Sequence, residues 1–200
     1  MHTNKLYVVG AGGHAKVVLD ALGQIGEPSG CVVVRDDRTV TGNNLLGYPV
    51  EYPAISDKVR LGSVHVAIGC CLTRRKLCNE AKSLGANLFS VHHPKADISS
   101  LSVIQDGCFI ASLSIVAAHA EIAEGTIVNH GAVVDHDCRI GRYCHVAPNA
   151  TLCGGVVVGD GVLIGAGATV LPGVSIGEGA KIGAGVVLKE NVEAGSVVRG

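Results

Sequence analysis

An aliphatic residue opens every block of six from residue 98 to residue 193 of this 200-residue chain, without an interruption. Four positions after each of them stands a small or β-branched residue. Neither the period of two typical of a strand nor the period of 3.6 typical of a helix produces this pattern. It therefore predicts a solenoid of hexapeptide repeats. The aliphatic positions are Ile98, Ile104, Ile110, Val116, Ile122, Val128, Val134, Ile140, Val146, Leu152, Val158, Ile164, Val170, Ile176, Ile182 and Leu188.

In a hexapeptide solenoid each repeat forms a short strand and a turn, and three repeats complete one triangular coil. Residues 18 apart should therefore stack on one another, and the repeats should make about five coils. The outer faces carry Val, Leu and Ala beside polar residues, which favours side-by-side assembly of subunits into a closed ring. Two series of glycines are interpreted as turn residues that need a positive φ. The first is Gly141, Gly159, Gly165, Gly177 and Gly183, and the second is Gly155, Gly161, Gly167, Gly173, Gly179 and Gly185.

The composition changes near residue 95, where helix-forming and charged stretches give way to Gly, Val, Ile and Ala. This change predicts two domains, residues 1–94 and residues 95–200. In the first, apolar runs typical of strands cover residues 5–9, 31–34, 64–68 and 87–91, and helical patterns cover residues 16–22 and about 73–84. Such an alternation is typical of a small parallel α/β unit of the Rossmann type.

A glycine-rich segment from Gly10 to Ala15 joins the first strand to the first helix and fits the pattern G-x-G-x-x-[GA]. Glycines there allow a ligand to approach the backbone, and the N–H groups at the start of the helix favour an anion. Asp36, at the end of the second strand, can contact a ribose or a base. A dinucleotide site usually needs two mononucleotide halves, and fewer than 95 residues precede the solenoid. A nucleotide-linked ligand is therefore favoured over NAD.

The net charge and the lack of a membrane-spanning segment exclude several classes of partner. The formal net charge of −1 predicts no binding to nucleic acid or to an anionic membrane surface. The chain has no uncharged apolar run long enough to span a membrane and no secretory signal at its start, so we expect a cytoplasmic protein without membrane insertion.

Of eight cysteines, Cys108, Cys138 and Cys144 occupy the small-residue position of the repeat. We expect reduced, structural thiols.

Several motifs are distributed along nearly the whole chain. They are Gly10-Ala11-Gly12-Gly13-His14-Ala15-Lys16-Val17-Val18, Arg35-Asp36-Asp37, Ala67-Ile68-Gly69, His93-Pro94 and Val133-Val134-Asp135-His136-Asp137-Cys138 within the hexapeptide array. In this combination the chain resembles the sugar O- and N-acetyltransferases of the sialic-acid O-acetyltransferase type. This family includes bacterial enzymes that acetylate UDP-4-amino sugars.

The resemblance implies a left-handed parallel β-helix, a homotrimer, acetyl-CoA bound between neighbouring solenoids and a nucleotide sugar held by the α/β domain. By position, His136 falls on the family's general base and Asp137 on the acidic neighbour that orients it, while Asn129 matches an asparagine near the acceptor sugar. The positions that match the nucleotide-sugar pocket are Gly12, Gly13, His14, Asp36, Asp37 and Gly69. The positions that match contacts to acetyl-CoA are His145, Gly154, Ala166 and Ala184. Family members continue with a Gly-x-Pro-Ala segment beyond the position of Gly200, so we expect either a missing adenine-side contact or a longer natural chain.

The chemistry requires a base, because a sugar amine is mostly protonated near neutral pH and must lose a proton before it attacks a thioester. His136 is the third residue of its hexapeptide, outside the aliphatic row, so we expect it on the outer surface. Either Asp135 or Asp137 can fix its tautomer and stabilise the imidazolium. Gly154 follows His136 by 18 residues, and its N–H is a candidate oxyanion donor with no side chain to block an acyl group.

The remaining solenoid residues leave some roles open. Direct transfer without an acyl-enzyme is expected, with Cys153 as the alternative nucleophile. His130 occupies the same repeat position as His136 one face earlier and is a candidate for the substrate pocket. For His119, a structural hydrogen bond and a catalytic relay both stay open.

The favoured function is acetyl-CoA-dependent N-acetylation of a nucleotide-linked 4-amino-deoxy sugar, because the paired Asp36 and Asp37 favour a nucleotide-linked ligand. Three alternatives stay open. They are O-acetylation of sialic acid or a related sugar, a non-catalytic nucleotide-sugar or NAD sensor, and a zinc enzyme similar to β-helix carbonic anhydrases. A zinc site needs converging imidazoles, whereas the solenoid histidines are 11, 6 and 9 residues apart, so no metal is expected.

Overall fold

The computed structural model of the chain describes residues 5–26, 31–37 and 44–200. The N-terminal part is a sheet in the order β3-β4-β2-β1-β5-β6, in which β3 and β4 pair antiparallel and the other described strands pair parallel. The predicted α/β unit is thus confirmed, with an added hairpin that the sequence pattern did not indicate. Its strands are β1 (Leu6–Val9), β2 (Val32–Arg35), β3 (Asn44–Leu45), β4 (Tyr48–Glu51), β5 (Ser63–Val66) and β6 (Asn87–Leu88), and a short 3-10 helix covers Asp57–Val59.

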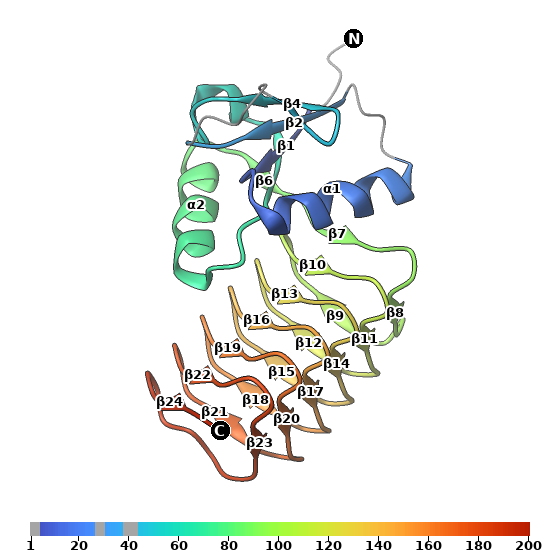
Figure 1. The fold of residues 1–200 in the computed structure, drawn as a ribbon, viewed down its shortest axis with the longest axis vertical. Helices are drawn as coiled ribbons and strands as arrows, with labels where there is room; N and C mark the ends of the chain where they lie inside the picture. The colour runs from blue at the N-terminus through green and yellow to red at the C-terminus, as the bar shows by residue number, and fades with distance from the viewer. Residues whose placement is uncertain (1–4, 27–30, 38–43) are drawn as a thin grey trace.

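Two α-helices accompany this sheet, α1 (Gly13–Ile25) and α2 (Cys71–Ser83). The first begins three residues earlier than predicted, directly within the glycine-rich segment, and ends at Gly26 in the left-handed conformation. Figure 1 shows α1 between the sheet and the first strands of the solenoid. Its apolar face packs in one cluster with β1, β2 and Phe109 of the solenoid. Neither helix found among the described residues has the length and apolar character needed to cross a membrane.

The second part is a left-handed parallel β-helix, as expected, with three faces that we name in chain order (Figure 1). The first face holds β7 (Val91–His92), β10 (Phe109–Ile110), β13 (Ile127–Val128), β16 (His145–Val146), β19 (Leu163–Ile164), β22 (Lys181–Ile182) and β24 (Val197–Val198). The second face holds β8 (Asp97–Ile98), β11 (Ile115–Val116), β14 (Val133–Val134), β17 (Thr151–Leu152), β20 (Thr169–Val170) and β23 (Val187–Leu188). The third face holds β9 (Val103–Ile104), β12 (Glu121–Ile122), β15 (Arg139–Ile140), β18 (Val157–Val158) and β21 (Ser175–Ile176).

The register of these faces follows the repeat, because Val116 pairs with Val134 and Val134 with Leu152. The β-helix extends beyond the sixteen hexapeptides at both ends, through β7 and β24. The strand predicted over residues 87–91 is divided, since the Phe89 N–H bonds to Val64 of the α/β sheet and the Val91 N–H bonds to Cys108 of the solenoid. In the sequence, Leu88, Phe89 and Val91 resemble a single strand, so the pattern did not indicate this change of sheet. The domain boundary at residue 94 stays a prediction.

The interior of the solenoid is formed by the aliphatic row and the small-residue row together. The side chains of Val116, Val134 and Leu152 are fully buried. Cys108 and Cys144 are also fully buried, and desolvation raises the pKa of each thiol to about 12. All eight cysteines are free thiols, and the full burial of Cys108, Cys138 and Cys144 agrees with the packing role expected from their place in the repeat.

The two glycine series differ in their physical role. The second series has positive φ angles, for example +67° at Gly161 and +65° at Gly167, as expected of turn residues. The same interpretation is wrong for the first series, which does not have a positive φ. At Gly141, Gly159, Gly165 and Gly177 a Cβ would collide with the next coil, for example at 2.5 Å from the Ala184 nitrogen for Gly165, and at Gly183 it would lie 3.1 Å from the Val198 carbonyl oxygen. These positions need glycine because the backbones of adjacent coils approach closely.

This difference predicts the effect of alanine on stability. Gly165→Ala should lower the free energy of unfolding by about 1–3 kcal/mol, because the new methyl group forces two coils apart. Gly23→Ala, in α1 with nothing within 4 Å of its added Cβ, should raise it by about 0.5–1 kcal/mol through helix propensity. Urea denaturation at one protein concentration measures both, and equal effects of the two variants would contradict this account.

Candidate active site

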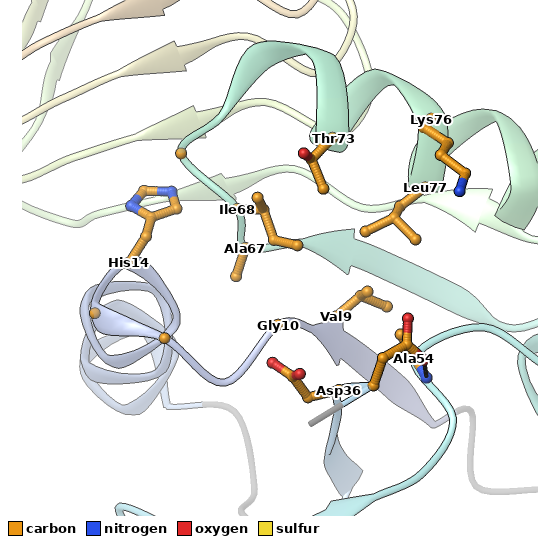
Figure 2. Close-up of a pocket in the computed structure, with 14 residues that line it drawn as sticks. Val9, Gly10, His14, Asp36, Ala54, Ala67, Ile68, Thr73, Lys76 and Leu77 are labelled. Atoms are coloured by element: carbon orange, nitrogen blue, oxygen red, sulfur yellow. Dashed lines mark hydrogen bonds between the residues drawn. The ribbon is translucent and has the colours of Figure 1, made fainter. Parts of the chain in front are cut away.

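A pocket of about 470 Å³ opens between α1, α2 and the carboxyl ends of the parallel strands. Figure 2 shows His14 of α1 and Asp36 after β2 on one side, with Thr73, Lys76 and Leu77 of α2 on the other. The residues predicted for the nucleotide-sugar pocket meet here. Those that line it are Gly12, Gly13, His14, Asp36, Asp37 and Gly69.

The glycine-rich segment shapes one wall of this pocket. Gly10 has a φ of +113°, and a Cβ there would lie 3.0 Å from the Ala67 carbonyl oxygen, so only glycine fits. The first turn of α1 has neither a side-chain cap nor an acidic residue. Its N–H groups and the ammonium group of Lys76, on the opposite wall, suit an anionic ligand such as a diphosphate. The sequence pattern indicated the glycines but not Thr73, Lys76 or Leu77, which only the position of α2 brings to the pocket.

The two acidic residues of the pocket, Asp36 and Asp37, accept hydrogen bonds from neighbouring backbone segments of the pocket wall. Asp36 Oδ2 accepts a hydrogen bond from the Ala11 N–H at 2.6 Å, and Asp37 Oδ1 accepts one from the Ala54 N–H at 2.8 Å. The buried Arg35 supports the same wall by donating to the Pro53 carbonyl at 2.7 Å. Part of the function of this acidic pair is therefore to hold the pocket open in one shape.

His145, in β16, joins the pocket to the solenoid. Its Nδ1 lies 3.1 Å from the Gly69 carbonyl oxygen, and its Nε2 lies 3.1 Å from Asn129 Nδ2. The Asn129 side-chain oxygen accepts a hydrogen bond from the His130 N–H at 2.9 Å. Burial first, then the charge of Arg74, lowers the pKa of His145 to about 4. The structure thus brings together Gly69, His145, Asn129 and the backbone of His130, with a neutral imidazole between them.

His14 lies beside this group, with its ring centroid 6.4 Å from that of His145 and 5.2 Å from that of Phe109. Burial lowers its pKa to about 3, and the nearby His65 and His145 add to the effect. Its buried Nε2 has no hydrogen-bond partner within residues 5–26, 31–37 and 44–200. His14 is therefore a neutral side chain of the pocket wall with one unused ring nitrogen, which suits contact with a ligand.

His136 lies on a different part of the molecule, at the corner between the second and third faces, and its side chain is 61% exposed. Its Nδ1 is 2.8 Å from Asp137 Oδ2, whereas Asp135 Oδ1 accepts a hydrogen bond from the His136 N–H at 2.7 Å. Of the two acidic neighbours, Asp137 therefore contacts the ring. Its hydrogen bond, followed by the charge of Asp135, raises the pKa of His136. Because Nδ1–H donates to a carboxylate, Nε2 is left to accept a proton.

Gly154 lies directly against this imidazole. A Cβ on Gly154 would come within 2.5 Å of both Cε1 and Nε2 of His136. The Gly155 N–H donates to the His136 carbonyl at 2.9 Å, which agrees with the predicted stacking of the coils. The glycine is thus needed first to admit the ring of His136. In the part of the chain that the structure describes, no acceptor for the Gly154 N–H is found.

The other two predicted acetyl-CoA positions lie elsewhere. Ala166 and Ala184 follow β19 and β22, at the corner between the first and second faces, where the Gly185 N–H donates to the Ala166 carbonyl. His136 and Gly154 occupy the opposite edge of the second face. One chain therefore does not gather these positions into a single site. No group of three or more His, Cys, Asp or Glu side chains suited to a metal occurs among the described residues.

Comparisons with protein families agree with both parts of the chain. Residues 5–81 match the PglD N-terminal domain, and residues 119–154 and 155–190 match the bacterial transferase hexapeptide (six repeats). A search of curated proteins gave no match.

Several solved structures match over nearly the whole length. The acetyltransferase domain of PglB from Neisseria gonorrhoeae, in complex with acetyl coenzyme A, is 33% identical with a TM-score of 0.90, and the match covers 98% of this chain and 96% of that one. A variant of perosamine N-acetyltransferase from Caulobacter crescentus, in complex with CoA and GDP-perosamine, is 36% identical with a TM-score of 0.85, covering 94% and 90%. WeeI from Acinetobacter baumannii is 28% identical with a TM-score of 0.87, covering 98% and 96%. The chain therefore belongs to the family of hexapeptide-repeat sugar acetyltransferases that includes the PglB acetyltransferase domain and perosamine N-acetyltransferase, and it is an acyltransferase.

Proposed function

We propose that this protein transfers the acetyl group of acetyl-CoA to the amine of a nucleotide-linked 4-amino-deoxy sugar. The observation that carries the proposal is the pair of His136 and Asp137, in which a carboxylate holds Nδ1 and leaves Nε2 to accept a proton. Perosamine N-acetyltransferase, which is 36% identical, binds CoA and GDP-perosamine, and the PglB domain binds acetyl coenzyme A. These ligands support a thioester donor and an amino-sugar acceptor for this chain as well.

In the proposed reaction, the nucleotide lies in the α/β pocket, with its phosphates near the start of α1 and Lys76. The sugar extends towards Gly69, Asn129 and His145. Because His136 and Asn129 lie at opposite edges of the second face, Nε2 of His136 of the partner subunit removes the proton that the amine loses as its nitrogen bonds to the thioester carbon. The Gly154 N–H stabilises the negative oxygen of the tetrahedral intermediate. The C–S bond then breaks, and the CoA thiolate takes the proton from the imidazolium, which Asp137 has stabilised.

We also propose that the active form is a homotrimer. The predicted acetyl-CoA positions divide between the two edges of the second face. Subunits packed side by side are therefore needed to bring one edge of a solenoid against the other edge of its neighbour. The faces and corners of the solenoid also leave large apolar side chains exposed that an interface would cover. Among them are Leu101, Val103, Leu113, Ile115, Val157 and Val187.

Thiol release from acetyl-CoA tests the function. A panel of UDP-, GDP-, dTDP- and CMP-linked 4-amino sugars is compared with the matched 4-hydroxy sugars. We expect release only with an amino sugar, and with one nucleotide preferred. Release with the hydroxy sugars or with sialic acid would assign O-acetylation instead. Ligand binding without any release would favour a sensor, and one tightly bound zinc per site would favour a metal enzyme.

The pH dependence of kcat/KM should be sensitive to the contact between His136 and Asp137. Because His136 must be neutral to act as a base, kcat/KM should rise with pH through its raised pKa. Asp137→Asn keeps a side-chain oxygen but removes the charge that stabilises the imidazolium, so the pKa of His136 should fall. The acid limb should then move to lower pH, and the rate above it should decrease because the base is weaker. The substrate amine titrates identically with both enzymes, so a limb that does not move would contradict the assigned pair.

A further inference from the structure

Arg74 is a charged side chain buried at the junction of α2 and the solenoid, only 1% exposed. Its guanidinium donates five hydrogen bonds to backbone carbonyls. Nε bonds to Gly125 at 2.7 Å, Nη1 to Ile68 at 2.7 Å and Gly69 at 3.0 Å, and Nη2 to Tyr143 at 2.8 Å and Cys144 at 2.9 Å. Planar donors in a fixed fork orient several acceptors at once, which the ammonium group of a lysine cannot do. This side chain therefore fixes the positions of two separate segments relative to each other.

Two of these carbonyls define the position of His145. The Gly69 carbonyl accepts hydrogen bonds both from Arg74 Nη1 at 3.0 Å and from His145 Nδ1 at 3.1 Å. The Cys144 carbonyl, bonded to Arg74 Nη2, belongs to the peptide group from which His145 extends. Arg74 thus holds the acceptor of the His145 ring and the backbone that carries this ring.

The same contacts determine where the proton of His145 lies. A carbonyl oxygen only accepts, so the ring proton is on Nδ1 and the lone pair is on Nε2. Asn129 Nδ2 donates to that lone pair, and the Asn129 oxygen is turned to the His130 N–H. The Gly69 carbonyl in the pocket wall thus orients the ring of His145, and this ring orients the side-chain amide of Asn129 on the solenoid.

We propose that Arg74 is a positioning residue, which sets the tautomer and orientation of His145, and through it of Asn129, at the sugar end of the pocket. It acts by holding the Gly69 carbonyl and the Cys144 peptide group in one fixed relation. The proposal rests on the proposed function for its kinetic consequences, but the effect on His145 is independent of any substrate.

The direct test is to determine the tautomer of His145 from the nitrogen-15 NMR chemical shifts of the histidine rings near neutral pH. The His145→Asn variant identifies the signals by their loss. In the wild-type protein we expect one tautomer, with the proton on Nδ1. In Arg74→Lys we expect the two nitrogen shifts to move towards each other, because the ring samples both tautomers. A wild-type proton on Nε2, or an unchanged spectrum in Arg74→Lys, would overturn the proposal.

Lys82→Met is the matched control. Lys82 also joins α2 to the solenoid, through an ion pair with Glu124 at 2.5 Å and a hydrogen bond to the Tyr143 hydroxyl at 3.5 Å. Among the described residues it makes no hydrogen bond to Gly69 or Cys144. Its loss should weaken docking of the helix and leave the His145 signals unchanged. The same spectral change in both variants would mean that Arg74 acts only by docking α2, and would overturn the positioning role.

The kinetic test separates positioning from folding. We expect Arg74→Lys to lower kcat by about 10- to 100-fold, because small displacements of aligned groups are costly. Lys82→Met should keep kcat within about twofold, because it leaves the bonds of Arg74 to the Gly69 and Cys144 carbonyls in place. An equal loss of kcat in both variants would overturn the proposal. If the wild-type protein transfers no acetyl group, the proposed function fails, while the NMR result still decides the role of Arg74.

Discussion

Replacing His136 with alanine should lower kcat by about 10²- to 10⁴-fold, the usual contribution of a positioned general base. The amine then has no group to accept its proton as it attacks the thioester. The imidazole is exposed and its ring contacts Asp137 and Gly154, so its removal should leave the fold intact. Thiol release at saturating substrates measures the loss, and light scattering checks that the oligomer is retained. Added imidazole should restore part of the activity.

His119→Asn is the control for this variant. His119 is an exposed histidine one coil before Asp137, with a φ of +60° that asparagine tolerates. We expect its kcat to stay within about twofold of wild type, because among the described residues no hydrogen bond joins the His119 side chain to Asp137 or to the ring of His136. A loss as large as that of His136→Ala would assign His119 to a proton relay. Normal turnover in His136→Ala would rule out His136 as the base.

Replacing Gly154 with alanine should lower kcat by about 100-fold, through displacement of His136. The new methyl group would lie 2.5 Å from Cε1 and Nε2 of the ring, so the ring must leave its position. The backbone itself tolerates alanine, because Gly154 does not have a positive φ. The N–H of this residue is also retained, so the loss reports the position of the base rather than the oxyanion contact.

A double variant identifies the cause of this loss. If Gly154 acts through His136, then His136→Ala combined with Gly154→Ala should be no slower than His136→Ala alone. A further tenfold loss in the double variant would show that the glycine has a second role, such as space for the acyl group. Full activity in Gly154→Ala would contradict the close contact with the imidazole.

Much of the solenoid could be predicted from its sequence, because every coil repeats the same local rule. The period of six places the aliphatic row inside and the three repeat cysteines beside it, and it sets Gly154 one coil beyond His136. The glycines of the first series were misinterpreted for a physical reason. Glycine is required at these positions because the backbone of the next coil lies too close for a Cβ, as Ala184 does at Gly165. The sequence of a single hexapeptide does not reveal this contact.

The site was predictable only where one segment supplies the chemistry. The histidine and two neighbouring acids at residues 135–137 are visible in the sequence, but only the structure shows that Asp137 contacts the ring. The contact of His145 with Gly69 joins positions 76 residues apart. The burial of Arg74 at their junction depends on how α2 packs against the solenoid. Such long-range relations have no local pattern that could indicate them.

The most direct test of the account is the product formed from acetyl-CoA and a nucleotide-linked 4-amino sugar. Mass spectrometry and NMR identify the atom that receives the acetyl group. We expect one added acetyl group on the sugar nitrogen, with release of CoA, and no such product from His136→Ala in the same time. An acetyl group on oxygen, or no acetylated nucleotide sugar although both ligands bind, would contradict it.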